Sequence, residues 1–407
     1  MVAARTRRID ADVDLLDVAG PRGVVFEKGP DGLAGRGEAL RIEVPDLSLA
    51  SLERVQATLA DVVVADEVRR PGTGPVGFAA LPFDPRAAAA FVVPEVVVGR
   101  SADGTRWLTT TGDDPADPVG HPAKLLAPAQ DEPRAGRFEV EGVQDTDDWM
   151  ATVVDATKRI AAGDFDKVVL AREVRVRADA PLPRLALLHR LRRAFPGCFT
   201  FAVGPMVGAS PELLVSRAGD TVRAHPMAGT APRGGDPTTD ARLAAALLSS
   251  SKDRAEHQIT IDMVWETLLP FCSYVDSEPE PSIVAVANVQ HLASLVEGRL
   301  SHPPASVLEL VHALHPTPAV AGWPVAPALE FIAAHEGIDR DRYAGPVGWV
   351  DAEGNGTWAV GIRSALVDGE VARLFAGVGV VSDSDPEAEL AETDAKFQAV
   401  LSAILRP

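Results

Sequence analysis

The sequence predicts an α+β fold in which helices pack outside large antiparallel β-sheets. Short segments with strand composition follow one another closely at 199–203, 213–217 and 221–224. Parallel strands need crossovers of a dozen or more residues, so this spacing favours antiparallel pairing. Groups of strands are also separated by groups of helical segments, which is typical of α+β proteins.

The N-terminal region, residues 1–135, mixes short β-rich segments with turn-rich joints. We expect it to pack into the same fold as the rest of the chain. Residues 112–136 contain many Pro, Asp and Gly residues and are predicted to form an exposed linker. A boundary is therefore expected near residue 140, with residues 140–407 forming the main domain.

A helix is predicted to start at Thr146, which can cap it, and to end at Gly163. Its apolar residues recur at helical spacing, at Trp149, Val153, Ala156 and Ile160. The next segment, 167–174, is short and rich in β-branched residues, so it is predicted to be a strand.

Further elements follow the same alternation. A helix is expected from 183 to 194, where Pro196 and Gly197 end it, and helical patterns with interruptions cover 240–275. Strands are predicted at 358–367 and 371–381, and an amphipathic helix at 387–405.

Composition excludes several classes of protein. A hydrophobic content of 46% is ordinary for a globular chain and excludes a disordered or fibrous one. The 58 acidic residues outnumber the 39 basic ones, which gives a net charge of −19, and no basic stripe marks a nucleic-acid interface. The two cysteines, Cys198 and Cys272, form neither a disulfide framework nor a thiolate metal site.

The expected location is the cytoplasm. The most apolar segment, 87–98, is interrupted by Pro94 and Glu95 and is shorter than the roughly 20 residues of a membrane span. Arginines near the N-terminus are followed by Asp10, Asp12 and Asp14 where a signal peptide has an apolar core.

Two acidic pairs are candidates for a metal site. Asp253 and Glu256 are three positions apart, as are Glu389 and Glu392, so each pair shares one face of a helix. A hard cation such as Mg²⁺ between the pairs would remove their mutual repulsion. The alternative is that each pair is an acidic first turn favoured by the helix dipole.

Lys167 and Glu212 are candidates for acid–base chemistry. Lys167 opens an apolar strand, where lost hydration would lower its pKa toward that of a general base; otherwise it is a strand-end lysine that reaches solvent. Glu212 lies between a Ser-Pro turn and a strand, where burial would keep it protonated as a general acid; otherwise it is an edge-strand carboxylate.

Two glycine-containing segments, 226–234 and 376–379, could present backbone N–H groups to a carboxylate. Neither has the glycine spacing of a dinucleotide site or the lysine of a phosphate-binding loop. His312 and His315 lack a third ligand nearby, so we interpret them as structural rather than as zinc ligands.

The order of these motifs resembles that of the chorismate-utilising enzymes over residues 140–405. The motifs are Lys-Val-Val-Leu-Ala-Arg at 167–172, Ser-Pro-Glu-Leu-Leu at 210–214, Ala-Gly-Thr-Ala-Pro-Arg-Gly at 228–234, Asp-Arg-Ala-Glu-His at 253–257, His-Leu at 291–292 and Asp-Pro-Glu-Ala-Glu-Leu-Ala-Glu-Thr at 385–393. The resemblance implies an anthranilate synthase component I-like fold, with 140–407 as the chorismate-binding catalytic domain and Mg²⁺ as cofactor.

The resemblance also implies a role for each matching residue. Lys167 matches the base that activates water, and Glu212 the acid that protonates the departing hydroxyl. Glu256 and Glu392 match metal ligands, and Asp253 and Glu389 the flanking carboxylates; the shorter Asp253 favours an outer position. The remaining matches are with the substrate pocket: Gly229, Thr230, His291, Ala319, Tyr343, Arg363, Gly377 and Lys396.

The segment His-Pro-Thr-Pro-Ala at 315–319 resembles the isochorismate synthase branch. Its continuation lacks the Gly-Ala-Pro-Lys of the amino-transferring branches, so no glutamine amidotransferase subunit is expected. The alternatives are a salicylate synthase, which also eliminates pyruvate and tends to carry Thr where Ala319 stands, and a non-catalytic relic of the family. A menaquinone and a siderophore pathway both remain open, as does the oligomeric state, for which a monomer is one option.

Overall fold

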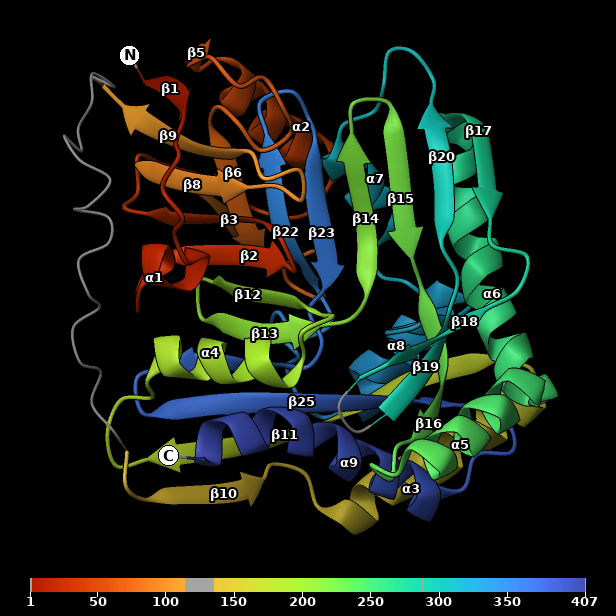
Figure 1. Cartoon of the computed structure of the whole chain (residues 1–407). Helices are drawn as coiled ribbons and strands as arrows, with labels where there is room; N and C mark the ends of the chain where they lie inside the picture. The colour runs from red at the N-terminus through yellow and green to blue at the C-terminus, as the bar shows by residue number, and fades with distance from the viewer. Residues whose placement is uncertain (1, 114–134, 287–288, 407) are drawn as a thin grey trace.

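The computed structural model describes residues 2–113, 135–286 and 289–406. Most of the predicted linker, residues 114–134, lies outside these ranges. Two large sheets face each other across a shared core, and a small third sheet lies beside them (Figure 1). Among the described residues every strand pair is antiparallel except β1 with β5.

The first sheet contains the longest strands of the described chain, β11 and β25. Its order is β10 (Phe138–Gly142), β11 (Lys167–Ala178), β25 (Val371–Val380), β24 (Ser364–Asp368), β13 (Met206–Ser210), β12 (Phe199–Val203), β2 (Val24–Lys28), β3 (Asp31–Arg36), β8 (Val96–Arg100), β9 (Arg106–Gly112), β1 (Ala3–Arg8) and β5 (Val63–Asp66). The two-residue strand β21 (Gly322–Trp323) pairs with the start of β11.

The second and third sheets complete the β-structure. The second runs in the order β17 (Cys272–Ser277), β20 (Val296–Leu300), β15 (Thr221–His225), β14 (Leu213–Ala218), β23 (Gly356–Val360), β22 (Pro346–Asp351), β6 (Val76–Ala80), β7 (Ala89–Val93) and β4 (Leu40–Val44). The third consists of β16 (Met227–Pro232), β19 (Val289–Ala293) and β18 (Ser282–Ala285).

Helices cover the outer faces of the sheets. They are α1 (Leu15–Ala19), α2 (Leu49–Ala60), α3 (Thr146–Ala162), α4 (Arg184–Ala194), α5 (Pro237–Ser249), α6 (Ser251–Leu268), α7 (Val307–Leu314), α8 (Val325–His335) and α9 (Pro386–Leu405). Helices α1, α4 and α9 pack on one face of the first sheet through a second apolar cluster (Figure 1). Within the described ranges, every helix is too short or too polar to cross a lipid bilayer.

Strands from the N-terminal region belong to both large sheets. In the first sheet β2 pairs with β12, and in the second β6 pairs with β22. The aromatic rings of Phe91 and Trp358 meet edge-on at 6.0 Å between centroids, and both side chains are buried. The described part of the N-terminal region therefore shares sheets and core with the rest of the chain.

Three local predictions were wrong in detail. Asp145 rather than Thr146 caps α3, because its carboxylate accepts hydrogen bonds from the N–H groups of residues 147 and 148. The predicted interruption in the segment 240–275 lies at Ser250, which caps α6, but the last residues of that segment belong to β17 rather than to a helix. The predicted strand 358–367 is two strands, β23 and β24, which lie in different sheets.

We predict that Phe91→Ala lowers the free energy of unfolding by about 3–5 kcal/mol, because it leaves a cavity beside Trp358. Chemical denaturation should still show one cooperative transition, since the core spans both sheets. The exposed Val64→Ala serves as a control and should change stability by less than about 0.5 kcal/mol. Two separate transitions, with only one shifted, would contradict a shared core.

Candidate active site

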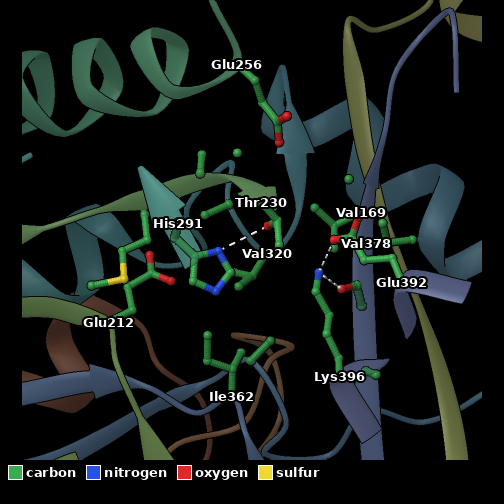
Figure 2. Close-up of a pocket in the computed structure, with 18 of the residues that line it drawn as sticks. Val169, Glu212, Thr230, Glu256, His291, Val320, Ile362, Val378, Glu392 and Lys396 are labelled. Atoms are coloured by element: carbon green, nitrogen blue, oxygen red, sulfur yellow. Dashed lines mark hydrogen bonds and ion pairs between the residues drawn. The ribbon is translucent and has the colours of Figure 1, made fainter. Parts of the chain in front are cut away.

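A polar cavity of about 240 Å³ lies where the three sheets meet. All fourteen residues that the sequence assigned to catalysis, substrate or metal line it. They come from both sides of the cavity and from segments far apart in the chain (Figure 2). The structure thus brings the predicted residues together; their individual roles remain predictions.

Glu212 and Arg363 lie where the chain changes sheets. The chain leaves the first sheet after β13, passes through Glu212 and enters the second sheet at β14; it returns through Arg363, between β23 and β24. Because β13 pairs with β24 and β14 with β23, the two crossings are neighbours. Backbone hydrogen bonds join them, from Ala209 N–H to the Arg363 carbonyl at 3.0 Å and from Val360 N–H to the Glu212 carbonyl at 3.1 Å.

The Glu212 carboxyl is neutral at neutral pH. Burial raises its pKa to about 8, although a hydrogen bond from the Met227 N–H and the nearby Lys167 ammonium both act to lower it. The protonated side chain can donate a proton to a group bound in the cavity. A buried and protonated Glu212 has the property that the predicted role of general acid requires; the role itself stays a prediction.

Arg363 is a buried cation whose nearest polar contacts are a histidine ring and a backbone carbonyl. Its Nη2 lies 3.4 Å from His291 Nε2, and its Nη1 lies 3.5 Å from the Lys396 carbonyl oxygen. In the described part of the chain no carboxylate forms an ion pair with it, and burial lowers its pKa from the ordinary arginine value. The guanidinium is therefore available to an anion in the cavity.

His291, on β19, faces Thr230, on the neighbouring strand β16 (Figure 2). Its Nδ1 lies 3.1 Å from Thr230 Oγ1, while its Nε2 faces Arg363. An arginine can only donate, so Nε2 accepts and the ring proton lies on Nδ1. Burial and the charge of Arg363 lower the pKa of His291 to about 3, so the ring is neutral.

Lys167 is buried at the start of β11, and its Nζ contacts Glu256 Oε1 at 2.6 Å. The sequence predicted only apolar neighbours for Lys167, whereas the structure also places a carboxylate beside it. Burial acts to raise the pKa of Glu256, but Lys167 outweighs it and the pKa falls below its ordinary value. A Cβ on Gly379 would lie 2.7 Å from Lys167 Cε, so only glycine leaves room for the lysine here.

The four predicted metal carboxylates approach the cavity from two helices, α6 and α9. Glu392 forms an ion pair with Lys396 at 2.7 Å, and the Lys396 ammonium also donates to the Gly377 carbonyl at 2.7 Å (Figure 2). Burial raises the pKa of Glu389, and the charge of Glu392 adds to the effect, although Ser384 lowers it. A cation beside Glu389 would stabilise its charged form.

These carboxylates fit a magnesium ion that is shared with a ligand. Among the described residues, no three His, Cys, Asp or Glu side chains stand close enough to hold a metal by themselves. Mg²⁺ is commonly bound through one or two carboxylates, with water and substrate oxygens as its other ligands. The carboxylates of this cavity match a site in which water and substrate oxygens complete the coordination of the ion.

Backbone conformation and close contacts explain why glycine stands at the two predicted positions 229 and 377. Gly229 has a φ of +76°, and a Cβ there would lie 3.2 Å from the Cβ of Asp253. A Cβ on Gly377 would lie 3.1 Å from the hydroxyl oxygen of Tyr343, whose pKa burial raises. Ala319 lines the cavity from the loop that precedes β21.

Several lining residues were not predicted. They include Lys252, Arg340 and four apolar residues, Val169, Val320, Ile362 and Val378. Val169 could have been found, because it lies two residues after Lys167 on a strand and so points to the same face. No local sequence pattern marked Arg340 as a site residue, because its position depends on contacts with segments far away in the chain.

Comparisons with known proteins agree with this arrangement. A family model described as "Chorismate binding enzyme" matches residues 27–405. MenF of Mycobacterium tuberculosis (strain ATCC 25618 / H37Rv) is 40% identical over 365 residues, which are 86% of this chain and 92% of that protein. Isochorismate synthase DhbC of Bacillus subtilis (strain 168) is 39% identical over 342 residues, 81% of each chain.

Solved structures confirm the predicted fold class. MenF of Escherichia coli, described as a menaquinone-specific isochorismate synthase, superimposes with a TM-score of 0.83 at 26% identity, covering 99% of this chain and 95% of that one. Anthranilate synthase component I of Streptococcus pneumoniae TIGR4 shares the fold, with a TM-score of 0.70 at 21% identity over 97% and 92% of the two chains. The match over almost the whole chain and the identity of its relatives show that this protein belongs to the chorismate-binding enzymes.

Proposed function

We propose that this enzyme is an isochorismate synthase, which converts chorismate to isochorismate with Mg²⁺. The observation that carries the proposal is that one cavity holds a buried, protonated Glu212, the amine of Lys167 and the guanidinium of Arg363, with which no described carboxylate forms an ion pair. Two relatives, from Bacillus subtilis and Escherichia coli, bear the name isochorismate synthase.

In the proposed reaction, a water oxygen bonds to C2 of the ring, both double bonds of the ring diene shift by one position, and the C4 hydroxyl leaves. Lys167 takes a proton from the attacking water, and Glu212 gives its proton to the departing hydroxide, so water is both consumed and released. Lys167 Nζ lies 2.6 Å from Glu256 Oε1, so the proposed base and a proposed metal ligand are in direct contact.

Substrate binding is assigned to the cationic side of the cavity. Chorismate is a dianion, and Arg363 offers a charge that no described carboxylate neutralises. Lys396 lies on the same side but is held by Glu392 and the Gly377 carbonyl. We assign Gly229, Thr230, His291, Ala319, Tyr343 and Gly377 to the remaining substrate contacts.

Glu256 and Glu392 would hold Mg²⁺, with Asp253 and Glu389 acting beside them through water. When bound, the ion supplies positive charge that draws electron density from the ring through a substrate carboxylate. We further propose that the chain acts without a glutamine amidotransferase subunit, because residues 315–324 lack the Gly-Ala-Pro-Lys ending of the amino-transferring branches.

The direct test is incubation of the purified protein with chorismate and Mg²⁺, followed by chromatographic identification of the product. Isochorismate without pyruvate is expected. Lys167→Ala should lower turnover by about 10²–10⁴-fold, the usual contribution of a general base, while substrate affinity changes little. Stoichiometric pyruvate would instead identify a salicylate synthase, and no product would refute the proposal.

The pKa of Glu212 predicts the alkaline side of the pH profile. A general acid must be protonated, so kcat/KM should fall as the pH rises through about 8. Glu212→Gln keeps the size of the side chain but cannot give up a proton, so turnover should drop and the alkaline limb should disappear. Glu27→Gln is the matched control, because Glu27 is also buried with a raised pKa but does not line the cavity. A normal rate in Glu212→Gln would remove this residue from the mechanism.

The metal assignment can be measured as binding. Titration calorimetry in the presence of chorismate should show that Glu256→Gln and Glu392→Gln weaken Mg²⁺ binding more than Asp253→Asn does, because direct ligands lose a coordinated oxygen. A chelator should abolish turnover, and added Mg²⁺ should restore it. Equal effects of the three substitutions would contradict the division into direct and outer carboxylates.

A further inference from the structure

The wall behind Lys167 contains a buried ion pair that the proposed mechanism does not use. Glu336 follows α8, and Arg340 lies four residues later; their side chains are 1% and 3% exposed. Arg340 lines the active-site cavity on one side and a second cavity of about 550 Å³ on the other. Arg340 also lies over the ring of Phe83, 4.3 Å from its centroid, so a ring contact and hydrogen bonds together hold it in place.

The guanidinium of Arg340 joins two segments of the active site. Its Nε and Nη2 donate to Glu336 Oε1 and Oε2 at 2.7 and 2.5 Å. Nη2 also donates to the Val169 carbonyl at 2.7 Å, and Nη1 donates to the Val320 carbonyl at 2.8 Å. Val169 is two residues from Lys167, and Val320 is next to Ala319. One side chain therefore links the strand of the proposed base to the loop beside the proposed ring site.

Glu336 and Arg340 also complete a stretch of the β11 edge that pairs with no strand of the described residues. On this edge β21 pairs with residues 167 and 168, and β10 pairs only from residue 174 onward. Between them the Val169 carbonyl accepts from Arg340, and the Ala171 N–H donates to Glu336 Oε2 at 2.7 Å. Buried backbone groups need partners, so these two side chains take the place of a strand where β11 passes the cavity, together with Gln144, which donates to the Ala171 carbonyl and accepts from the Glu173 N–H.

We propose that Arg340 and Glu336 are positioning residues that hold β11, and with it Lys167, in register with the loop of Ala319. This inference rests on the proposed function, in which Lys167 acts as the base. The pair touches the backbone of the active-site segments, and its effect on the reaction passes through Lys167. A displacement of β11 by about 1 Å would move the amine out of reach of the attacking water.

Arginine is required because its donors lie in a rigid plane and reach one carboxylate and two backbone carbonyls at once. Lysine keeps the charge beside Glu336 but cannot reach both backbone carbonyls as well. Arg340→Lys thus keeps the positive charge that neutralises Glu336 but removes the hydrogen bonds that hold the two backbone segments. The expected result with chorismate and Mg²⁺ is a fall in kcat of about 10²-fold, the loss that a misplacement of about 1 Å can cause, with KM little changed.

The matched control is Arg192→Lys. Arg192 forms a bidentate ion pair with Asp14 and also contacts the buried Glu27, but it does not line the cavity. Arg192→Lys should lower the melting temperature, as Arg340→Lys does, but it should leave kcat unchanged. Both variants are assayed at a temperature at which circular dichroism shows them to be folded. A wild-type kcat in Arg340→Lys would overturn the inference. So would a rise in KM as large as the fall in kcat, because that pattern indicates general damage to the pocket.

A double variant separates positioning from stability. Replacing a buried ion pair by apolar residues is often neutral for folding, so Glu336→Leu with Arg340→Met is expected to melt near the wild type. Its kcat should nevertheless fall as in Arg340→Lys. If the double variant is folded and fully active, the pair does not position the base; if it does not fold, Arg340→Lys decides.

Hydrogen exchange tests the inference without any activity. The Ala171 amide, which is bound to Glu336, should exchange faster in Arg340→Lys than in the wild type or in Arg192→Lys. Unchanged exchange there would overturn the positioning role. A wild-type protein that forms no isochorismate would count against the proposed function instead, so the two failures are distinguishable.

Discussion

The active site depends on the place where the chain changes from one sheet to the other and back. Both crossings lie at the same point, because β13 and β24 are neighbours in the first sheet while β14 and β23 are neighbours in the second. Strands that diverge there expose backbone and side chains to a cavity that no strand fills. Glu212 occupies one crossing and Arg363 the other, so a buried acid and a buried cation face the same small space. Sheet topology, rather than any single loop, gives these two residues their environment.

Charge in the cavity is balanced locally and not by the chain as a whole. With a net charge of −19 the protein repels an anionic substrate, so the site must supply its own positive field. Lys167 and Lys396 are each neutralised by a glutamate, Glu212 is protonated, and His291 is neutral. Arg363 therefore carries the charge that remains for a substrate carboxylate. Burial is the largest cause of the pKa shifts of Glu212 and His291, and it favours the neutral form of each.

Motifs in the sequence located the site residues, whereas their partners came only from the structure. Lys167, Glu212 and the acidic pairs could be selected because each lies in a short local pattern next to a predicted strand or helix. The ion pair between Lys167 and Glu256 joins residues 89 positions apart, and no local pattern reveals it. The sequence predicted one strand over 358–367, because strand-forming residues continue through the turn at Arg363. The chain changes sheets at this turn, where Arg363 has a φ of +52°. Arg340 also escaped prediction, because its role consists of contacts to Val169 and Val320, which lie far away in the chain.

The mixing of N-terminal and C-terminal strands in both sheets has a consequence for the order of folding during synthesis. The early strands β2 and β6 pair with their neighbours β3 and β7 on one edge, but on the other edge they must wait for β12 and β22, which are made much later. Their unpaired edges are open to wrong pairing during that interval. Glu392 and Lys396 lie on α9, the final helix, so the cavity acquires part of its charge only when nearly all of this sequence has been translated. Such long-range contacts slow folding and lengthen the time for which these strand edges are exposed.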